Sequence, residues 1–227
     1  MSSCGNNEQK TNTSTTSDSS TVSKKDSNTT STIDTNHQTM MVVWHKVADF
    51  QKWKASFESH DSMKLSFGIH NYVVGRNVED SNLLMVATKA DDVNKAKAFI
   101  KDPTLKTAMQ KSGVTGPPMI LLNTIVYQDT TPNISTVRSM TMFTVKDWDA
   151  WRKAFENGRQ LRKDNGITDR AYGYDVDDNH KVTLVVAIND SAKANAFWKS
   201  DLIKQKRAES GVVGEVKQRL YRVAVKY

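Results

Sequence analysis

The chain has 227 residues, of which a quarter are charged and 37% are hydrophobic, and its formal net charge is +7. This composition is typical of a soluble globular protein with one or two domains. The single cysteine, Cys4, excludes an internal disulfide. The positive charges alternate with Asp and Glu, which indicates a solvated basic surface.

The N-terminal segment, residues 1–38, consists mainly of Ser, Thr, Asn, Asp and Lys. Such a segment cannot bury enough apolar surface to fold, so it is predicted to be a disordered tether. Ser2-Ser3-Cys4-Gly5 resembles the cleavage region of a bacterial lipoprotein. The resemblance implies that Cys4 is lipidated, that the precursor begins upstream of Met1 and that the protein lies in the cell envelope, periplasmic or surface-facing. The alternative is an incidental cysteine in a flexible terminus. No later run of 18 apolar residues is present to span a membrane.

A second feature is a repeat at a fixed interval of 98 residues. Residues 112–116, Ser-Gly-Val-Thr-Gly, return as residues 210–214, Ser-Gly-Val-Val-Gly, and Trp53 returns as Trp151. Similarities at this interval continue along the chain without an insertion. The pattern predicts a duplicated domain, with repeat 1 at residues 39–129, a linker at 130–137 and repeat 2 at 138–227.

Each repeat predicts the same series of elements. In the first, a strand at residues 40–46 precedes a helix that Asp49 caps and Gly68 ends. Two strands follow at residues 69–75 and 83–87, and then a second helix, which Asp92 caps and Asp102-Pro103 interrupts. The last strand is at residues 119–127. The order β-α-β-β-α-β is ferredoxin-like, and each sheet needs a cover on its second face, which the other copy can provide.

The spacing within residues 49–118 supports a resemblance to a known fold family. Asp-x-x-x-Trp-x-x-x-Phe-Glu is followed by Gly-Ile, Ala-x-Ala-Phe and Ser-Gly-Val-x-Gly-Pro-Pro. This pattern resembles the dimeric α+β barrel superfamily, which includes antibiotic-biosynthesis-monooxygenase-like proteins. The resemblance implies an α+β fold in which two ferredoxin-like units pack as a barrel within one chain. Members include cofactor-free oxygenases, isomerases, haem-binding enzymes and proteins with no known reaction, so the fold does not define the function.

The ligand site implied by this resemblance is a cavity between sheet and helices. The first repeat carries titratable residues where the second has others, and histidine suits proton transfer near neutral pH. We therefore expect the site in repeat 1. The alternative is that these histidines are structural, satisfied by backbone carbonyls or by a helix end. The candidate catalytic residues are His45, His60 and Asp61, and the candidate pocket residues are Trp44, Trp53, Phe57, Phe67 and His70.

Several other kinds of site lack their motif. No HxxxH or HExxH spacing indicates a metal, and no cofactor is expected. The repeated glycines lack the ending of a P-loop and are interpreted as turns. Strand 83–87 has no aromatic residue for stacking on RNA, so no nucleic-acid partner is expected.

Two functions remain. One is a lipid-anchored small-molecule-binding or accessory protein without catalysis. The other is a cofactor-independent monooxygenase or isomerase that acts on a small hydrophobic substrate in repeat 1. The expected partners are a small hydrophobic molecule and, through Cys4, a membrane. An exposed sheet edge also leaves further oligomerisation open.

Overall fold

The computed structural model describes residues 32–227, so Cys4 and most of the predicted tether lie outside the described residues. The described residues form one compact unit. It begins earlier than the predicted boundary near residue 38, because the short strand β1 (Ile33–Asp34) pairs with the end of β5, Ile33 opposite Asp129. Gln38 already belongs to the next strand. The last residues of the predicted tether are therefore part of the sheet.

The first half follows the predicted order with one more break. Its elements are β2 (Gln38–Val47), α1 (Phe50–Ser59), α2 (Asp61–Ser66), β3 (Ile69–Asn77), β4 (Leu83–Ala90), α3 (Val93–Lys101), α4 (Pro103–Lys111) and β5 (Val114–Asp129). The side chain of Asp49 accepts a hydrogen bond from the Lys52 backbone N–H, which is the predicted N-cap. The sequence predicts one helix up to residue 65, whereas the structure has two that meet at His60.

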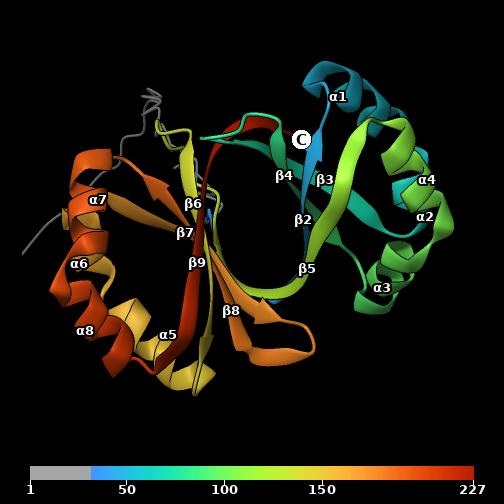
Figure 1. The fold of residues 1–227 in the computed structure, drawn as a ribbon. Helices are drawn as coiled ribbons and strands as arrows, with labels where there is room; N and C mark the ends of the chain where they lie inside the picture. Colours follow the sequence, from blue (N-terminus) through green and yellow to red (C-terminus); the bar gives the residue numbers. More distant parts are fainter. Residues whose placement is uncertain (1–31) are drawn as a thin grey trace, which may run out of the picture. The chain divides into compact units, whose positions relative to one another are not determined.

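The second half contains the same elements, each displaced by about 98 residues. They are β6 (Val137–Val145), α5 (Trp148–Asn157), α6 (Arg159–Asp164), β7 (Ile167–Asp175), β8 (Asp178–Ile188), α7 (Ser191–Lys199), α8 (Asp201–Glu209) and β9 (Val212–Lys226). Every helix of this half begins 98 residues after its counterpart, for example Trp148 after Phe50 and Asp201 after Pro103. Helices α1–α4 and α5–α8 lie on opposite sides of the strands (Figure 1).

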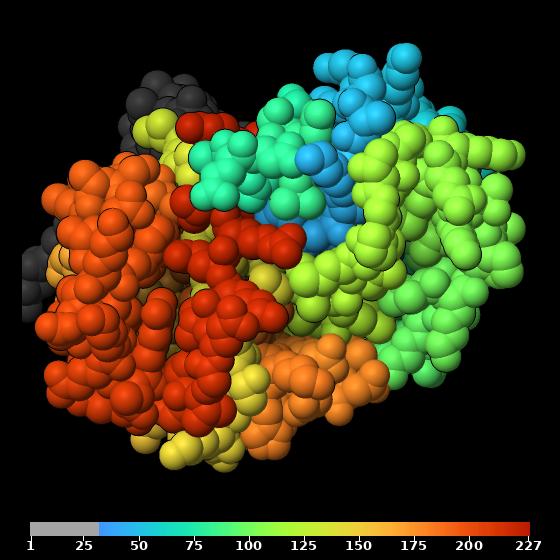
Figure 2. All heavy atoms as spheres, in the orientation of Figure 1, coloured from blue at the N-terminus to red at the C-terminus, as the bar shows by residue number. Residues whose placement is uncertain are grey.

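The strands form one antiparallel sheet that closes on itself. Their order is β1-β5-β2-β4-β3-β9-β6-β8-β7, and β7 also pairs with β5. The eight strands from β2 to β9 therefore make a ring, with β1 outside it on the edge of β5. Two seams join the halves, namely β3 with β9 and β5 with β7. In the space-filling view, side chains of β9, in red, fill the face between the two helical groups (Figure 2).

Glycines occupy the positions where these seams are tightest. A Cβ on Gly173 of β7 would lie 2.0 Å from the Thr124 carbonyl oxygen of β5. A Cβ on Gly75 of β3, 98 residues earlier, would lie 2.2 Å from the Tyr221 ring of β9. Glycine therefore leaves room for the β5 backbone at one seam and for the Tyr221 ring at the other.

The repeated Ser-Gly-Val-x-Gly segment lies where a helix passes into a strand. Gly113 follows α4 and Gly211 follows α8, both with positive φ, and each half then continues into a long strand. These are helix-to-strand turns, as the sequence predicts.

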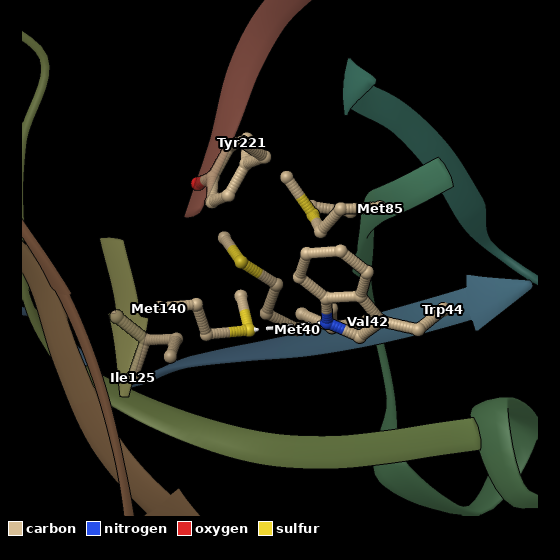
Figure 3. Close-up of a cluster of buried hydrophobic side chains, with 8 residues drawn as sticks. Met40, Val42, Trp44, Met85, Ile125, Met140 and Tyr221 are labelled. Carbon is tan, nitrogen blue, oxygen red and sulfur yellow. Dashed lines mark hydrogen bonds between the residues drawn. The ribbon is translucent and has the colours of Figure 1, made fainter. Parts of the chain in front are cut away.

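A cluster of apolar side chains occupies part of the interior of the ring. Met40, Val42, Trp44, Met85 and Met140 pack there with Ala87, Ile125 and Tyr221 (Figure 3). Trp44 donates its indole N–H to the Met140 sulfur at 3.4 Å. The opposite face of each half of the sheet packs against its helices, where Trp53 and Trp151 are buried. Each strand of the ring thus has one face toward the interior and one toward helices.

Candidate active site

A cavity of about 80 Å³ lies between the first-half sheet and helices α1–α4. Strands β2 and β4 supply its floor, since directly opposed residues of an antiparallel pair project to the same face. His45, Val43 and Met41 of β2 lie opposite Leu84, Val86 and Thr88 of β4. The cavity is lined by Met41, Val43, His45, Trp53, Phe57, His60, Met63, Lys64, Ile69, Val86, Thr88, Phe99, Leu105, Ala108, Met109, Ser112 and Ile120.

His45 is a buried titratable group of this cavity. Its side chain is 5% exposed, and neither ring nitrogen has a hydrogen-bond partner among residues 32–227. The ring lies 5.5 Å from that of Trp53, centroid to centroid. Burial without a partner lowers the pKa of His45 from 6.5 to about 4. The imidazole is therefore neutral at physiological pH, and one nitrogen retains a free lone pair.

A β-bulge in the neighbouring strand β5 lies beside His45. The pairing of β2 with β5 changes register between Trp44 and Lys46, where Trp44 opposes Met119 but Lys46 opposes Thr115. Two residues of β2 thus span four of β5, and the extra residues include Gly116, which has φ of +77°. Bulges of this kind redirect side chains and are frequent beside active sites.

Two further polar groups belong to the cavity wall. Thr88 is 2% exposed, and its hydroxyl has no partner. It lies four positions along the sheet from His45, about 13 Å away. His60, at the junction of α1 and α2, places Nδ1 2.6 Å from the Ser56 carbonyl oxygen. That contact assigns the proton to Nδ1 and leaves Nε2 as an acceptor.

Lys64 is a wall residue that sequence reasoning missed. It is 4% exposed, and its ammonium donates to the Phe57 carbonyl at 2.9 Å and to Asn71 Oδ1 at 2.8 Å. It forms an ion pair with Asp61 at 2.7 Å and lies 3.4 Å above the centre of the Phe57 ring. Burial lowers the pKa of Lys64, while Asp61 acts in the opposite direction. A signal was present, because the residue 98 positions later, Arg162, is also basic.

The structure gathers only part of the expected site. His45, His60, Trp53 and Phe57 line the cavity. Trp44 faces the barrel interior, as expected from the alternation of side chains along β2.

The remaining candidates also lie outside the lining. Asp61 is half exposed and pairs with Lys64. Phe67 packs on Phe99, with ring centroids 5.4 Å apart. His70 is exposed, with Nε2 2.9 Å from Asp91 Oδ1. These four corrections, Trp44 included, leave His45 and His60 as the candidate catalytic residues within the cavity.

The second half has a larger cavity in the corresponding place, about 360 Å³, although the polar candidate residues led us to expect the site in the first half. Trp151 and Phe155 line it as Trp53 and Phe57 line the first, but Phe143 stands where His45 would be. Arg162 corresponds to Lys64, and its guanidinium makes two 2.7 Å hydrogen bonds to the buried carboxylate of Asp169. The first-half cavity thus contains the candidate base His45, whereas the second-half cavity has the larger volume.

Two observations on the described part of the chain concern metal ligands and apolar helices. Within residues 32–227, no three His, Cys, Asp or Glu side chains are grouped as metal ligands. No helix in that range is long and apolar enough to cross a membrane.

Comparison with known proteins identifies the fold. No protein-family model and no curated protein sequence matches the chain. Solved structures do match over most of their length. An anthrone oxidase-like protein has a TM-score of 0.56 and 13% identity, covering 86% of this chain and 95% of that one. A "putative monooxygenase" from Lactobacillus acidophilus has a TM-score of 0.55 and 12% identity, covering 83% and 94%. A "putative chlorite dismutase" has a TM-score of 0.56 and 12% identity, covering 83% and 96%.

The chain has the dimeric α+β barrel fold. The closed antiparallel sheet with helices on two sides agrees with these matches. At such identities the likeness concerns the fold alone, because this fold carries unrelated activities on the same frame.

Proposed function

We propose that this α+β barrel is a cofactor-independent monooxygenase or isomerase that acts on a small hydrophobic substrate in the first-half cavity. The observation that carries the proposal is His45, a buried imidazole in an apolar cavity whose two ring nitrogens have no partner within the described part of the chain. A buried polar side chain without a partner costs free energy. A substrate that hydrogen-bonds to His45 would remove that cost.

The role proposed for His45 is that of a general base. Its lowered pKa keeps it in the basic form, but a pKa of about 4 also makes it a weak base in the empty cavity. A proton taken from the substrate would leave a carbanion or phenolate beside the new imidazolium. This opposite charge favours the protonated form and raises the pKa during the reaction. The mechanism therefore requires a substrate with an acidic C–H or O–H group.

Both reaction types can follow from this proton transfer in a balanced way. In an oxygenase, a methylene carbon and dioxygen give a carbonyl and water, with His45 taking the first proton. In an isomerase, the proton returns to another carbon of the same substrate. The solved neighbours described as an anthrone oxidase-like protein and a "putative monooxygenase" support the oxygenase version.

The small volume of the cavity limits the substrate. At about 80 Å³ it falls below the roughly 300–1,000 Å³ of typical ligand sites. Met41, Met63 and Met109 line it, and methionine side chains adapt easily to the shape of a ligand. We propose that these side chains move when the substrate enters.

The function is tested by measuring oxygen consumption with anthrones and hydroquinones as substrates. We expect turnover by the wild type and a loss of about 100-fold or more in kcat/KM for His45→Phe, which copies Phe143 at the corresponding position. His180→Gln, a change at an exposed histidine, serves as the control. Equal turnover by His45→Phe and the wild type would exclude His45 as the base.

A binding protein without catalysis is the second candidate, and the second-half cavity favours it. That cavity is about 360 Å³, is lined by Trp151, Phe155 and Trp198, and holds Phe143 in place of a base. A competition assay tests this function, in which the test substrates displace a bound hydrophobic fluorescent ligand. Tight binding with no turnover in the wild type would support the second candidate over the first.

Two features of the whole chain complete the proposal. We propose that the halves are tandem ferredoxin-like units derived by duplication, and the recurrence of all eight main elements at an interval of about 98 residues supports this. We also propose that Cys4 carries a lipid that anchors the protein in a bacterial cell envelope. The support for the anchor is the sequence around Cys4.

A further inference from the structure

A third cavity, of about 220 Å³, lies inside the ring of strands. Buried residues Met40, Met85 and Met140 form part of its wall, and exposed residues Thr130, Lys226 and Tyr227 line it as well. It therefore extends from the apolar core of Figure 3 toward the barrel end that these exposed residues mark. It lies on the opposite face of the sheet from His45 and is independent of the site proposed above.

The wall of this cavity is divided into a polar side and an apolar side. Apart from Lys226 at the end of β9, the charged and amide side chains come from β5, β7, β8 and β6, which are consecutive around the ring. The wall formed by the other four strands, β2, β4, β3 and β9, is mostly aliphatic and aromatic. The polar side consists of Asn123, Gln128, Asp129, Arg138, Arg170 and Thr183.

The division breaks the correspondence between the two halves. Two pairs of lining positions 98 residues apart differ in character. Met40 corresponds to Arg138 and Tyr72 to Arg170. The cavity thus has one apolar and one basic member of each pair, as an amphipathic ligand would require.

Arg138 is the central cation of the polar side. It is 6% exposed, and its Nη1 donates to the carbonyls of Ser135 at 2.7 Å and Val137 at 2.9 Å. Among the described residues, none accepts a hydrogen bond from its other nitrogens, and no carboxylate pairs with it. A buried guanidinium with neutral partners alone is left without a counter-ion. Burial lowers its pKa, and nearby Arg170 acts in the same direction.

Arg170 adds a second positive charge. It lies at a β-bulge of β7, where the pairing with β8 changes register between Asp169 and Ala171. Its only ion pair among residues 32–227 is a loose one, 3.6 Å from Asp129. Strand β8 separates Arg170 from Arg138, so the two backbones are about 10 Å apart, within reach of two long side chains.

Asn123 supplies an unused donor on the same side. The residue is 1% exposed, and none of the residues that the structure describes accepts a hydrogen bond from its Nδ2. Its Oδ1 accepts from the Thr183 hydroxyl at 3.1 Å. Together, the ionised lining side chains are three cations, Arg138, Arg170 and Lys226, against Asp129. The free groups are donors, so a ligand must supply acceptors and negative charge.

We propose that the barrel interior binds a small amphipathic carboxylate, with its carboxylate on Arg138 and Arg170 and its apolar body on the methionine-lined wall. The volume suits a molecule smaller than typical drug-sized ligands. A buried carboxylate would provide Arg138 with its missing counter-ion and Asn123 with an acceptor.

Calorimetric titration with sodium hexanoate tests this site on the full chain, with hexan-1-ol and acetate as comparison ligands. Hexanoate should bind about tenfold or more tightly than either, because hexanol lacks the charge and acetate lacks the apolar body. Arg138→Met, which copies Met40, should weaken hexanoate binding about tenfold or more and leave hexanol binding unchanged. Arg222→Met, the same change at an exposed position of β9, is the matched control.

Methyl NMR of methionine-labelled wild-type protein locates the ligand without any variant. Hexanoate should shift the Met40, Met85 and Met140 signals. Shifts confined to Met41 and Met63, in the first-half cavity, would overturn the proposal. So would an absence of hexanoate binding, or an unchanged affinity in Arg138→Met.

Discussion

The protonation of His45 should control how stability depends on pH. In the unfolded chain a histidine binds a proton below about pH 6.5, whereas folded His45 does so only below about pH 4. Between these values the unfolded state holds more protons, so stability falls as the pH falls through this range. The destabilisation is absent above the upper value and complete below the lower one.

The size of the effect follows from the two pKa values. Between about pH 7.5 and about pH 5, His45 should remove about 2 kcal/mol from the free energy of unfolding, out of about 3 kcal/mol at lower pH. Other groups titrate in the same range, so the measurement needs a variant that differs at His45 alone. His45→Phe is suitable, since Phe143 packs against Trp151 at the corresponding place with ring centroids 5.4 Å apart.

Urea denaturation of the wild type and of His45→Phe at both pH values measures the effect. The stability difference between the two proteins should change by about 2 kcal/mol in favour of the variant as the pH falls. A difference that stays constant with pH would show that His45 has an ordinary pKa. The imidazole would then have a partner or solvent access, which would contradict its description as a buried base without a partner in the first-half cavity.

Other predictions concern the seams, the buried ion pairs and the N-terminus. Gly173→Ala should lower the free energy of unfolding by about 2 kcal/mol or more, because the added methyl meets the Thr124 backbone at the β5–β7 seam; an unchanged urea midpoint would contradict the close approach. Asp169→Asn should cost about 3 kcal/mol because it leaves the Arg162 guanidinium, 11% exposed, without its carboxylate. Asp61→Asn should cost about 1 kcal/mol or less, since Asp61 is half exposed and Lys64 keeps two other acceptors, and equal losses in the two variants would refute this comparison. Mass spectrometry of the precursor expressed in a bacterium should show a lipid on Cys4, and an unmodified Cys4 with its upstream segment retained would exclude the anchor.

The order of elements could be predicted from sequence because short-range signals define it. Asp49, Asp92 and Pro103 start helices where expected. The break between α1 and α2 at His60 was missed, because residues 50–66 contain no proline or glycine to indicate it. The early start of the sheet at Ile33 was also missed, because a two-residue strand depends on its partner β5 and not on its own composition.

The candidate site could be predicted only in part. His45 was found from the difference between the repeats, and its alternation with Trp44 along β2 already placed Trp44 on the other face. Thr88 became visible only through burial, which depends on how helices and sheet pack, and the sequence signal for Lys64 was limited to the basic residue Arg162 at the corresponding position. The cavity volumes likewise depend on side-chain shapes across several elements, and no local pattern encodes them.

The closure of the ring by two seams within one chain has a consequence for folding. Val73 pairs with Lys226, far away in the sequence and close to its end, so the barrel cannot close until its last strand is made. Folding is therefore expected to be slow for the size of the protein. No second copy is required to complete the sheet, so the unfolding midpoint should not depend on protein concentration. A covalent link between halves also frees each half to change its side chains separately, a freedom that two identical subunits never have.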